Sequence, residues 1–288
     1  ANQNDLFQID GAEGVNEITF KDFASAVSLD LASNTIEAQT NGSSDLSSGP
    51  LHTIATLANI QNLTGSAFGD YLAGDGNDNY ISGGAGNDTI LGRSGNDVLK
   101  GGVGDDLLVG GSGSTTFVFE RGDGHDVIQF GSQAISQAVR NTIQFGQGIA
   151  ATDLHFSRTG NDLVITIDGS SDQLVINDQF ASGENLQRID TLNFVDGTAV
   201  SAFEIQKIIH LTEGNTTLEH ALRDGSVVID DIENSGWTDL SLAFVNAKDV
   251  VLSSSGSNLL ISIPSFGQSI TLIGALDARG VSLTELQF

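Results

Sequence analysis

Acidic side chains recur every nine residues between positions 70 and 106. Asp70, Asp88, Asp97 and Asp106 hold four of six successive positions in this series. The stretch around each of them is rich in glycine, so main-chain carbonyl groups stand close to each carboxylate in the sequence. Calcium binds six to eight oxygens, drawn from carboxylates and carbonyls, at ~2.3–2.6 Å. The spacing therefore indicates a site for a hard divalent cation that is repeated along the chain.

Two further series share the nine-residue period. One consists of glycines and the other of apolar residues: Gly65, Gly74, Gly83, Gly92, Gly101 and Gly110, and Leu72, Ile81, Ile90, Leu99, Leu108 and Phe117. A glycine-rich flexible linker is the alternative interpretation, since residues 65–130 contain 17 of the chain's 35 glycines. A linker has no reason to repeat an aliphatic residue at a fixed interval. The period instead predicts a stacked solenoid, in which each repeat is a turn followed by a very short strand.

The repeat unit is clearest at residues 83–91 and 101–109, which read GGAGNDTIL and GGVGDDLLV. This unit resembles the calcium-binding nonapeptide of RTX (repeats-in-toxin) haemolysin-type proteins, whose pattern is G-G-x-G-x-D-x-U-x. The resemblance implies a right-handed parallel β-roll in which two repeats make one coil of eighteen residues. It also implies that each calcium ion lies between the turns of repeats n and n+2.

Carried over position by position, the resemblance implies about four calcium ions. Each ion takes the second and fourth carbonyls and the aspartate of one turn, with the first and third carbonyls and the aspartate of the next turn. The implied ligand sets are Ser66, Phe68 and Asp70 with Gly83, Ala85 and Asp88; Gly74, Gly76 and Asp78 with Gly92, Ser94 and Asp97; Gly84, Gly86 and Asp88 with Gly101, Val103 and Asp106; and Gly102, Gly104 and Asp106 with Arg121, Asp123 and Asp126.

Two positions depart from the repeat pattern. The turn at residues 74–78 is one residue short, and the strand that follows is one residue long. We take Asp78 rather than Asn79 as the ligand of that turn. The pairing of Asp97 with Thr115 lacks one carboxylate, so we expect that position to be weak or empty.

The composition narrows the class of protein. The chain carries 37 acidic and 11 basic residues, a formal net charge of −26, which argues against nucleic-acid binding and against electrostatic docking on anionic membranes. It has no cysteine, so disulfides and thiolate metal sites are excluded. No stretch approaches the ~18 consecutive apolar residues of a transmembrane segment, and the first ten residues are not a signal peptide. Because the chain lacks methionine even at position 1, we expect a processed protein or a piece of a longer one.

We expect an all-β chain whose first half is solenoid. Residues 1–64 are predicted to form a degenerate, metal-poor start of the solenoid that caps its first coil. Residues 65–130 are predicted to form the calcium-binding roll. Without calcium, short strands with repelling aspartates have little core, so metal binding becomes folding free energy.

The second half contains an internal duplication. Residues 153–167 align with residues 249–263 at an offset of 96, and each copy predicts a β-hairpin around a Gly/Asn turn. The first copy resembles the calcium-binding-related domain that follows RTX rolls and is assigned to residues 131–205. The second, fainter copy is assigned to residues 206–288. We expect β-rich, sandwich-like domains with one or two short helices, for which the candidate segments are 202–211 and 217–223.

Motifs for catalysis are absent from the sequence. It contains no G-x-S-x-G, no H-E-x-x-H and no G-x-x-x-x-G-K-[ST], and its five histidines are scattered. We therefore expect no active site within this chain.

The resemblance implies a module of a secreted bacterial protein, exported by a type I secretion machinery and folded by calcium outside the cell or at its surface. In this interpretation the module is a scaffold or interaction domain of an adhesin or toxin, whose partner is a host or surface glycan or protein. Two alternatives stay open. One is the C-terminal calcium-binding and secretion portion of a secreted enzyme, such as a protease, lipase or polysaccharide epimerase. The other is a calcium-dependent glycan-binding domain, for which Phe68 and Tyr71 are the available aromatic residues near the first turn.

Overall fold

A computed structural model gives the fold of the chain. It describes residues 7–11, 14–33, 35–38, 52–131, 139–181, 187–213, 217–221, 227–229, 239–243, 245, 247–272 and 285–287. The predicted excursion at residues 40–50 lies outside these ranges. The chain divides into two compact units, Ala1–Ala199 and Val200–Phe288, and each is described by itself.

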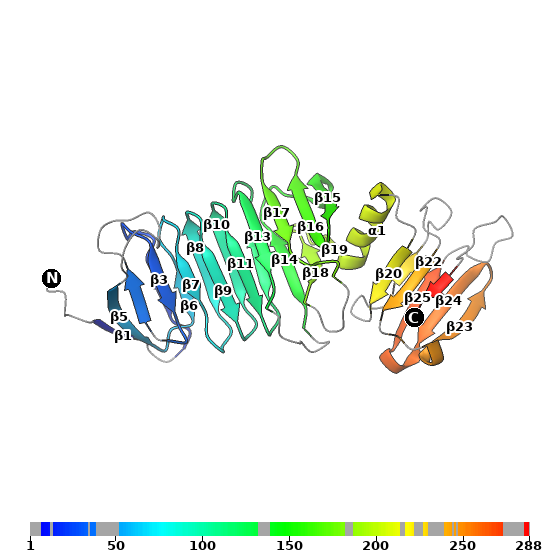
Figure 1. Cartoon of the computed structure of the whole chain (residues 1–288), viewed down its shortest axis with the longest axis horizontal. Coiled ribbons are helices and arrows are strands. Elements are labelled where there is room, and N and C mark those ends of the chain that lie inside the picture. The colour runs from blue at the N-terminus through cyan, green and yellow to red at the C-terminus, as the bar shows by residue number, and fades with distance from the viewer. Residues whose placement is uncertain are drawn as a thin grey trace. The chain divides into compact units, whose positions relative to one another are not determined.

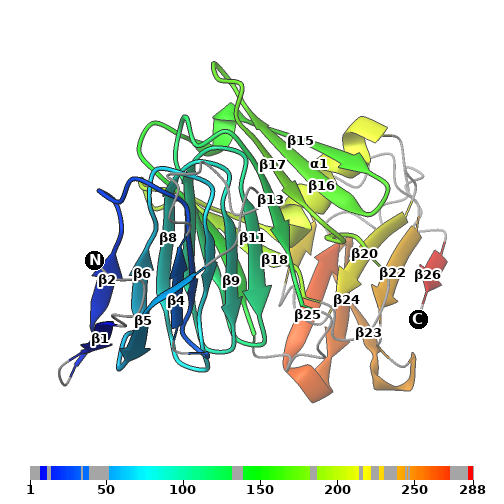
Figure 2. The same ribbon diagram turned by 60° about the vertical axis from the view of Figure 1, so that its left-hand side comes forward.

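Unit 1 is built on two sheets of mostly parallel strands (Figures 1 and 2). In spatial order, the described strands of the first sheet are β1 (Phe7–Asp10), β5 (His52–Ala58), β4 (Thr35–Ala38), β3 (Val27–Asp30), β7 (Tyr71–Ala73), β9 (Thr89–Arg93), β11 (Leu107–Gly111), β13 (His125–Gln129), β17 (Gln173–Ile176), β16 (Asp162–Ile167) and β15 (Leu154–Thr159). Those of the second sheet are β19 (Ala199–Ser201), β18 (Ile189–Asn193), β14 (Asn141–Phe145), β12 (Thr116–Phe119), β10 (Val98–Val103), β8 (Tyr80–Ala85), β6 (Asn62–Thr64) and β2 (Glu17–Thr19).

The chain alternates between the two sheets, so two nine-residue repeats make one coil. Strand β9 pairs in parallel with β11, with Ile90 opposite Leu108. On the other sheet β8 pairs in parallel with β10, with Ile81 opposite Leu99. Partners in both ladders are eighteen residues apart. The eighteen-residue coil is therefore confirmed, and unit 1 is a parallel β-roll.

The apolar series of the sequence forms the core between the two sheets. Its members are stacked in two columns, one on each sheet, and each is at most 1% exposed: Leu72, Ile90, Leu108 and Ile128, and Leu63, Ile81, Leu99, Phe117 and Ile143. Burying one such side chain contributes roughly 1.5–3 kcal/mol. Because the strands have only three to six residues, each coil adds few of these side chains and relies on its neighbours.

The sheets continue on both sides of residues 65–130. At the start, β2 pairs in parallel with β6 and β3 with β7, so part of the segment 1–64 belongs to the same stack. At the other end, β14 and β18 extend one sheet in parallel, and β17 pairs in parallel with β13 on the other. The parallel ladders therefore cross position 130 without interruption.

The predicted hairpin of the first copy is β15 and β16, which follow the short 3-10 helix η1 (Ala151–Asp153). They pair antiparallel, with Leu154 opposite Ile167, and β16 pairs antiparallel with β17. Figure 2 shows this hairpin beside β17. The hairpin thus extends the edge of the first sheet in the antiparallel sense, and the chain then returns to the parallel stack through β17.

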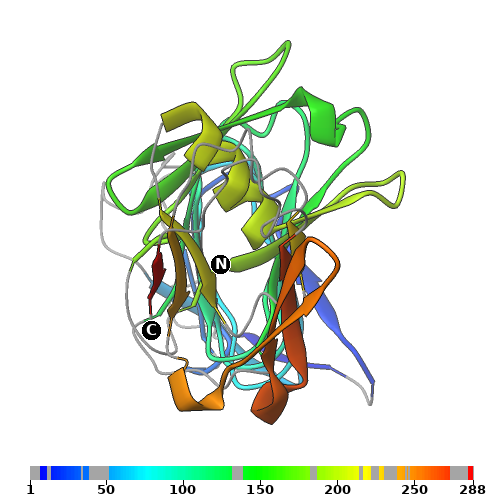
Figure 3. The ribbon, with the colours of Figure 1, turned by 90° about the vertical axis from the view of Figure 1, so that its right-hand side faces the viewer.

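Unit 2 has the same kind of architecture. One sheet contains the parallel strands β20 (Thr217–Ala221), β22 (Asp239–Ala243) and β26 (Glu285–Gln287). The other contains β21 (Val227–Ile229), β25 (Gln268–Leu272), β24 (Asn258–Ile263) and β23 (Val251–Ser255). Figure 3 shows the hairpin β23–β24 in orange and the helix α1 (Ala202–Glu213) in yellow. Two 3-10 helices, η3 (Ala247–Asp249) and η4 (Pro264–Phe266), flank this hairpin.

The second predicted helix, near 217–223, is wrong where the structure describes it. Residues 217–221 form strand β20, which pairs in parallel with β22 over its whole length. Pairing with a neighbouring strand decides the conformation here, because local helix propensity is only a weak preference. In the described part of the chain α1 is the one α-helix, and its Phe203 joins the buried core of unit 2 with Leu240, Leu242, Ile261 and Ile270.

The strand registers show which positions of unit 2 correspond to positions at the end of unit 1. Asp126 of β13 lies opposite Leu174 of β17, and Val227 of β21 lies opposite Ile270 of β25. Leu174 and Ile270 are 96 residues apart, which is the offset of the duplication. Val227 therefore occupies the strand position of Asp126, so the second copy has an aliphatic residue where the first has a carboxylate.

Candidate calcium-binding edges of the roll

The turns between the two sheets form two edges of the roll. We call one the aspartate edge, because Asp70, Asp88 and Asp106 directly precede β7, β9 and β11, and Asp126 is the second residue of β13. We call the other the mixed edge. Its residues lie at the starts of strands of the second sheet: Asn79, Asp97 and Thr115 directly precede β8, β10 and β12, Asn141 begins β14, and Asp190 is the second residue of β18. All nine are at most 8% exposed.

One carboxylate oxygen of each later aspartate on the aspartate edge accepts a main-chain hydrogen bond from the coil before. The N–H of Asp70 donates to Oδ1 of Asp88 at 2.7 Å, and that of Asp88 donates to Oδ1 of Asp106 at 2.7 Å. The N–H of Asp106 donates to Oδ1 of Asp126 at 3.1 Å. These bonds fix each carboxylate at the boundary between two coils.

The other carboxylate oxygen has no hydrogen-bond partner. Oδ2 of Asp88, Asp106 and Asp126 is buried and unpaired, although these residues are only 1–2% exposed. A buried polar oxygen without a partner costs about 1–3 kcal/mol, and more when it is charged. A cation between the turns would remove this cost, and the unpaired oxygens are where it would bind.

Burial acts on the acidity of the same groups. Loss of solvent raises the pKa of Asp88 to about 9, that of Asp126 to about 8 and that of Asp106 to about 7. Neighbouring carboxylates contribute to these raised pKa values, and the main-chain N–H donors partly oppose them. Without a cation, the fold therefore opposes the charged form of the groups that a calcium site needs.

Main-chain carbonyl groups converge on the same gap between turns. A methyl group added at Gly102 would collide with the carbonyl oxygen of Gly84, and one at Gly104 with that of Gly86. In the opposite direction, a methyl group at Gly83 would lie 2.6 Å from the carbonyl oxygen of Gly101. The carbonyls of Gly84 and Gly86 thus point forward and that of Gly101 points back, into the space between the two turns.

For Asp88 and Asp106, the repeat resemblance implies four carbonyl ligands. Three of them, the carbonyls of Gly84, Gly86 and Gly101, are the ones that point into this space. The fourth, that of Val103, accepts the N–H of Gly86 at 2.8 Å and therefore also faces the preceding turn. Such close approach requires glycine, since Gly84, Gly86 and Gly102 all have φ between +104° and +112°.

The first turn of the aspartate edge differs from the others. Both oxygens of Asp70 accept hydrogen bonds: Oδ1 from the N–H of Val27 at 2.7 Å and the Ser66 hydroxyl at 2.9 Å, and Oδ2 from the N–H of Ser66. The carbonyl of Ser66 still lies close to Gly84 of the following turn, and that of Gly83 lies close to Gly65 of the preceding turn. Phe68 lies next to Gly86, and Ala85 donates its N–H to Ser66 at 3.4 Å.

The last turn of the aspartate edge is two residues longer, yet it stacks in the same way. The N–H of Gly104 donates to the carbonyl of Asp123 at 2.7 Å, as Gly86 donates to Val103. Oδ2 of Asp123 accepts the N–H of Glu120 at 2.7 Å, so its main chain rather than its side chain faces the preceding turn. The Arg121 guanidinium points onward and donates to the carbonyls of Gly148 and Asp168.

On the mixed edge, the structure places Asn79, and not the predicted ligand Asp78, at the inward position of its turn. Asn79 is 3% exposed, and its N–H donates to Oδ1 of Asp97 at 3.0 Å, as that of Asp70 does to Asp88. Asp78 is exposed and accepts the N–H of Asn96 at 2.6 Å, in an outer row of turn residues. The short turn shifts its residues by one, so Asn79 keeps the inward position that the nine-residue series assigns to it.

The other predicted residues of this turn pair are placed as follows. A methyl group at Gly74 would lie 2.7 Å from the carbonyl of Gly92, so that carbonyl faces the preceding turn. Ser94 donates its N–H to the carbonyl of Asp75 at 3.3 Å, whereas Gly76 is exposed at the tip of its turn. Asp97 has a buried, unpaired Oδ2, and burial raises its pKa to about 7. The Thr115 hydroxyl is likewise buried without a partner.

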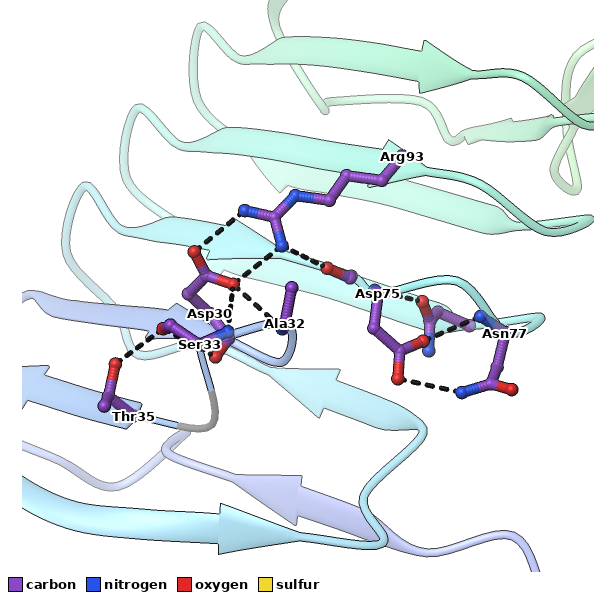
Figure 4. A network of polar contacts seen from close by, with 9 residues as sticks. Asp30, Ala32, Ser33, Thr35, Asp75, Asn77 and Arg93 are labelled. Atoms are coloured by element: carbon purple, nitrogen blue, oxygen red, sulfur yellow. Dashed lines mark hydrogen bonds and ion pairs between the residues drawn. The ribbon is translucent and has the colours of Figure 1, made fainter.

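An ion pair at the start of the mixed edge was not predicted. Arg93 binds both carboxylate oxygens of Asp30, at 2.7 and 2.8 Å, and donates to the carbonyl of Gly74 at 2.9 Å (Figure 4). Arg93 stands where other turns have their second glycine and has φ 71°. The one sequence signal was this replacement of a glycine, since Asp30 is 63 residues away.

Side chains alone do not complete a metal site in the described part of the chain. No three acidic or histidine side chains come together there in a metal-binding group. An ion between turns would have one or two carboxylates, and its remaining ligands would be main-chain carbonyls. Calcium accepts this mixture, whereas magnesium demands a tight octahedral arrangement.

The roll and its stacked glycine turns define a repeat protein of the parallel β-roll type. Comparison with known families gives the particular repeat: residues 64–99 and 83–117 match the RTX calcium-binding nonapeptide repeat. Residues 162–202 match the haemolysin-type calcium binding protein related domain. The resemblance to RTX haemolysin-type calcium-binding proteins is therefore confirmed, and within residues 64–117 the chain has repeats of this type.

Two similar proteins extend the comparison. The iron-regulated protein FrpA of Neisseria meningitidis serogroup C is 29% identical over 114 residues, which are 39% of this chain. The aligned part covers 10% of that protein. The crystal structure of the extracellular lipase LipA from Serratia marcescens aligns over 76% of this chain and 40% of its own, with 14% identity and a TM-score of 0.28. None of the described helices has the length and apolarity of a membrane-spanning segment.

Proposed function

We propose that this chain is a calcium-gated folding module of a secreted bacterial RTX protein. The observation that carries the proposal is the set of unpaired oxygens of Asp88, Asp106 and Asp126, buried in line along one edge of the roll. Glycine carbonyls face the same gaps between turns. Calcium bound there would pair these oxygens and neutralise their charge.

The gating follows from the electrostatics of the roll. Burial opposes ionisation of the edge aspartates, and the chain as a whole carries a net charge of −26. Repulsion among these charges destabilises the stack until divalent cations offset it. Calcium modules outside cells commonly have dissociation constants of ~10⁻⁴–10⁻³ M, so the roll would stay unfolded at low cytosolic calcium.

The biological role we propose is that of a scaffold. An unfolded acidic chain suits export through a type I secretion machinery, and external calcium would then fold it outside the cell or at its surface. The parallel ladders support an extended, regular framework, while sequence motifs for catalysis are absent. We propose that the module carries or presents other parts of a larger adhesin or toxin, and that it has no catalysis of its own.

The test is a calcium titration of the whole chain, followed by circular dichroism and by hydrogen exchange with mass spectrometry. We expect β-structure to be gained cooperatively, with protection appearing in residues 71–129. Magnesium is the matched control and should not produce this change at the same concentration. Identical spectra and protection in calcium and in chelator would overturn the proposed gating.

A further inference from the structure

We infer that tight calcium binding is confined to the aspartate edge, and that the mixed edge is closed by the protein's own amide and guanidinium groups. This inference rests on the proposed calcium binding, and it concerns where along the roll the ions are held. It differs from the arrangement that the repeat pattern implies, in which ions are placed on both edges.

The gaps on the aspartate edge have paired acidic ligands. Asp88 and Asp106 flank one gap, and Asp106 and Asp126 flank the next; each of the three has an unpaired buried oxygen. Asp70 and Asp88 flank an earlier gap, in which Asp70 is already satisfied by Val27 and Ser66. An ion in any of these gaps meets two carboxylates, which together balance its charge of +2.

The mixed edge has amides at the corresponding positions, and these are already bonded on both sides. The Asn79 amide donates to the carbonyl of Gln61 at 2.8 Å, and its oxygen accepts the N–H of Asp75 at 3.0 Å. The Asn141 amide donates to the carbonyl of Arg188 at 3.1 Å, and its oxygen accepts the N–H of Thr115 at 2.9 Å. An amide N–H thus binds a main-chain carbonyl that would otherwise be available to a cation.

At the start of the mixed edge, a cationic side chain occupies the place that a metal ion would take. The Arg93 guanidinium donates to the carbonyl of Gly74, the first carbonyl of its turn, and its charge is balanced by Asp30. Both side chains are about two-thirds to three-quarters buried, at 31% and 25% exposure. A metal ion at this position would have to displace a guanidinium that makes three hydrogen bonds.

Asp97 is the one carboxylate of the mixed edge with an unpaired oxygen in the described structure. Its neighbours along the edge are Asn79 and Thr115, eighteen residues away on either side, and both are uncharged. An ion beside Asp97 would therefore meet a single carboxylate and keep a net positive charge. Such an ion is held weakly compared with one between two aspartates.

The experiment compares Asp106→Asn with Asp97→Asn in the whole chain. Asparagine keeps the oxygen that accepts the main-chain N–H and replaces the other, unpaired oxygen by an uncharged amide NH2 group. Bound calcium is counted by calorimetry and by metal analysis after dialysis at micromolar free calcium. We expect Asp106→Asn to lose two tight ions, because Asp106 lies between two gaps, and Asp97→Asn to keep the wild-type count. Loss of tight ions in Asp97→Asn would overturn the inference.

Two further measurements keep the test decisive if Asp106→Asn does not fold. An anomalous-scattering map of wild-type crystals grown in calcium should place the ions beside Asp88, Asp106 and Asp126. Asn79→Asp combined with Arg93→Gly should add one tight ion, because it creates an acidic pair with Asp97 and removes the guanidinium that binds the carbonyl of Gly74. Ions of equal occupancy on both edges would overturn the inference while leaving the proposed function intact. No bound calcium in the wild type would overturn the proposed function itself.

Discussion

The main-chain N–H of Asp88 donates to Oδ1 of Asp106, eighteen residues later, at 2.7 Å. The N–H of Asp70 makes the same bond to Asp88 itself. Each aspartate is therefore held by the coil before it and holds the coil after it. This relationship couples the acidic residues of the edge into one row, and it determines how substitutions along the row should rank.

Replacing an aspartate within the row should raise the calcium concentration needed for folding more than replacing one outside it. Asp88→Ala and Asp106→Ala each remove a carboxylate between two gaps and a hydrogen-bond acceptor of the preceding coil. Asp78→Ala removes an exposed carboxylate and is the control. The measurement is the midpoint of a calcium titration followed by circular dichroism. Equal midpoints for the three variants would contradict the shared position of Asp88 and Asp106.

Acid should partly replace calcium in ordering the roll. The pKa values of Asp88, Asp106 and Asp126 in the fold are about 9, 7 and 8, above the value of 3.8 in the unfolded chain. A group whose pKa is raised by folding stabilises the fold fully below its unfolded pKa, and this stability is lost as the pH rises through the folded value. In chelator we expect more β-structure at pH 4 than at pH 9.

Calcium should reverse this dependence on pH. Protons and calcium compete for the same carboxylates, so the calcium midpoint should fall as the pH rises from 5 to 9. The readout is a series of calcium titrations at fixed ionic strength. A calcium midpoint independent of pH, together with a chelated spectrum independent of pH, would exclude the buried aspartates as the ligands.

Alanine at Gly102 should destabilise the calcium-loaded roll more than alanine at Gly122. Both glycines have positive φ, 104° and 94°, so each substitution carries a backbone cost of about 1–3 kcal/mol. At Gly102 the added methyl group also collides with the carbonyl of Gly84, whereas at Gly122 it meets open space. Overpacking of this kind costs a further ~1–3 kcal/mol. Urea unfolding at saturating calcium measures the difference, and equal losses would count against close stacking of the turns.

Thr115→Asp should create a calcium site on the mixed edge. The Thr115 hydroxyl is buried without a partner, one coil after the unpaired Oδ2 of Asp97. An aspartate there supplies the second carboxylate, and the count of bound ions should rise by one. Thr116→Asp is the control, since Thr116 is on the outward side of β12 and is partly exposed. If both variants bind the same number of ions as the wild type, the space between Asp97 and position 115 does not accept a metal ion, and the prediction is wrong.

Much of the roll could be predicted from the sequence because its period is set by local chemistry. Glycines at fixed intervals permit the turns, and one apolar residue per repeat, such as Ile90 or Leu99, fills the core. The same regularity predicted the positions of Asp88 and Asp106. A fixed period cannot predict how an irregular turn adjusts. At residues 74–79 the inward position of the turn is occupied by the uncharged Asn79, and the charged Asp78 lies outside.

Features that depend on distant segments could not be predicted in this way. The pair Arg93 and Asp30 joins positions 63 residues apart, and neither residue type indicates the other. The segment of β20 has a pattern that also suits a helix, and its parallel pairing with β22 decides the outcome. The continuation of the sheets past position 130 depends on β14 and β17, which lack the glycine turns of the repeat.

The row of hydrogen bonds along each edge has a consequence for how loops are accommodated. Successive partners on the mixed edge are 18, 26 and then 49 residues apart, for Asn79 to Asp97, Thr115 to Asn141 and Asn141 to Asp190. The contact is nevertheless made in all three pairs, whereas between Asp97 and Thr115 the N–H of Asp97 donates to the carbonyl of Ser114 instead. The hydrogen bond between neighbouring coils is therefore kept whatever the number of residues in the connecting loop. Foreign peptides inserted between β13 and β14 should be displayed without disturbing the coils on either side. Natural chains built on this plan can lengthen their turns in the same way, so a single stack can gain new surface loops while its interior stays unchanged.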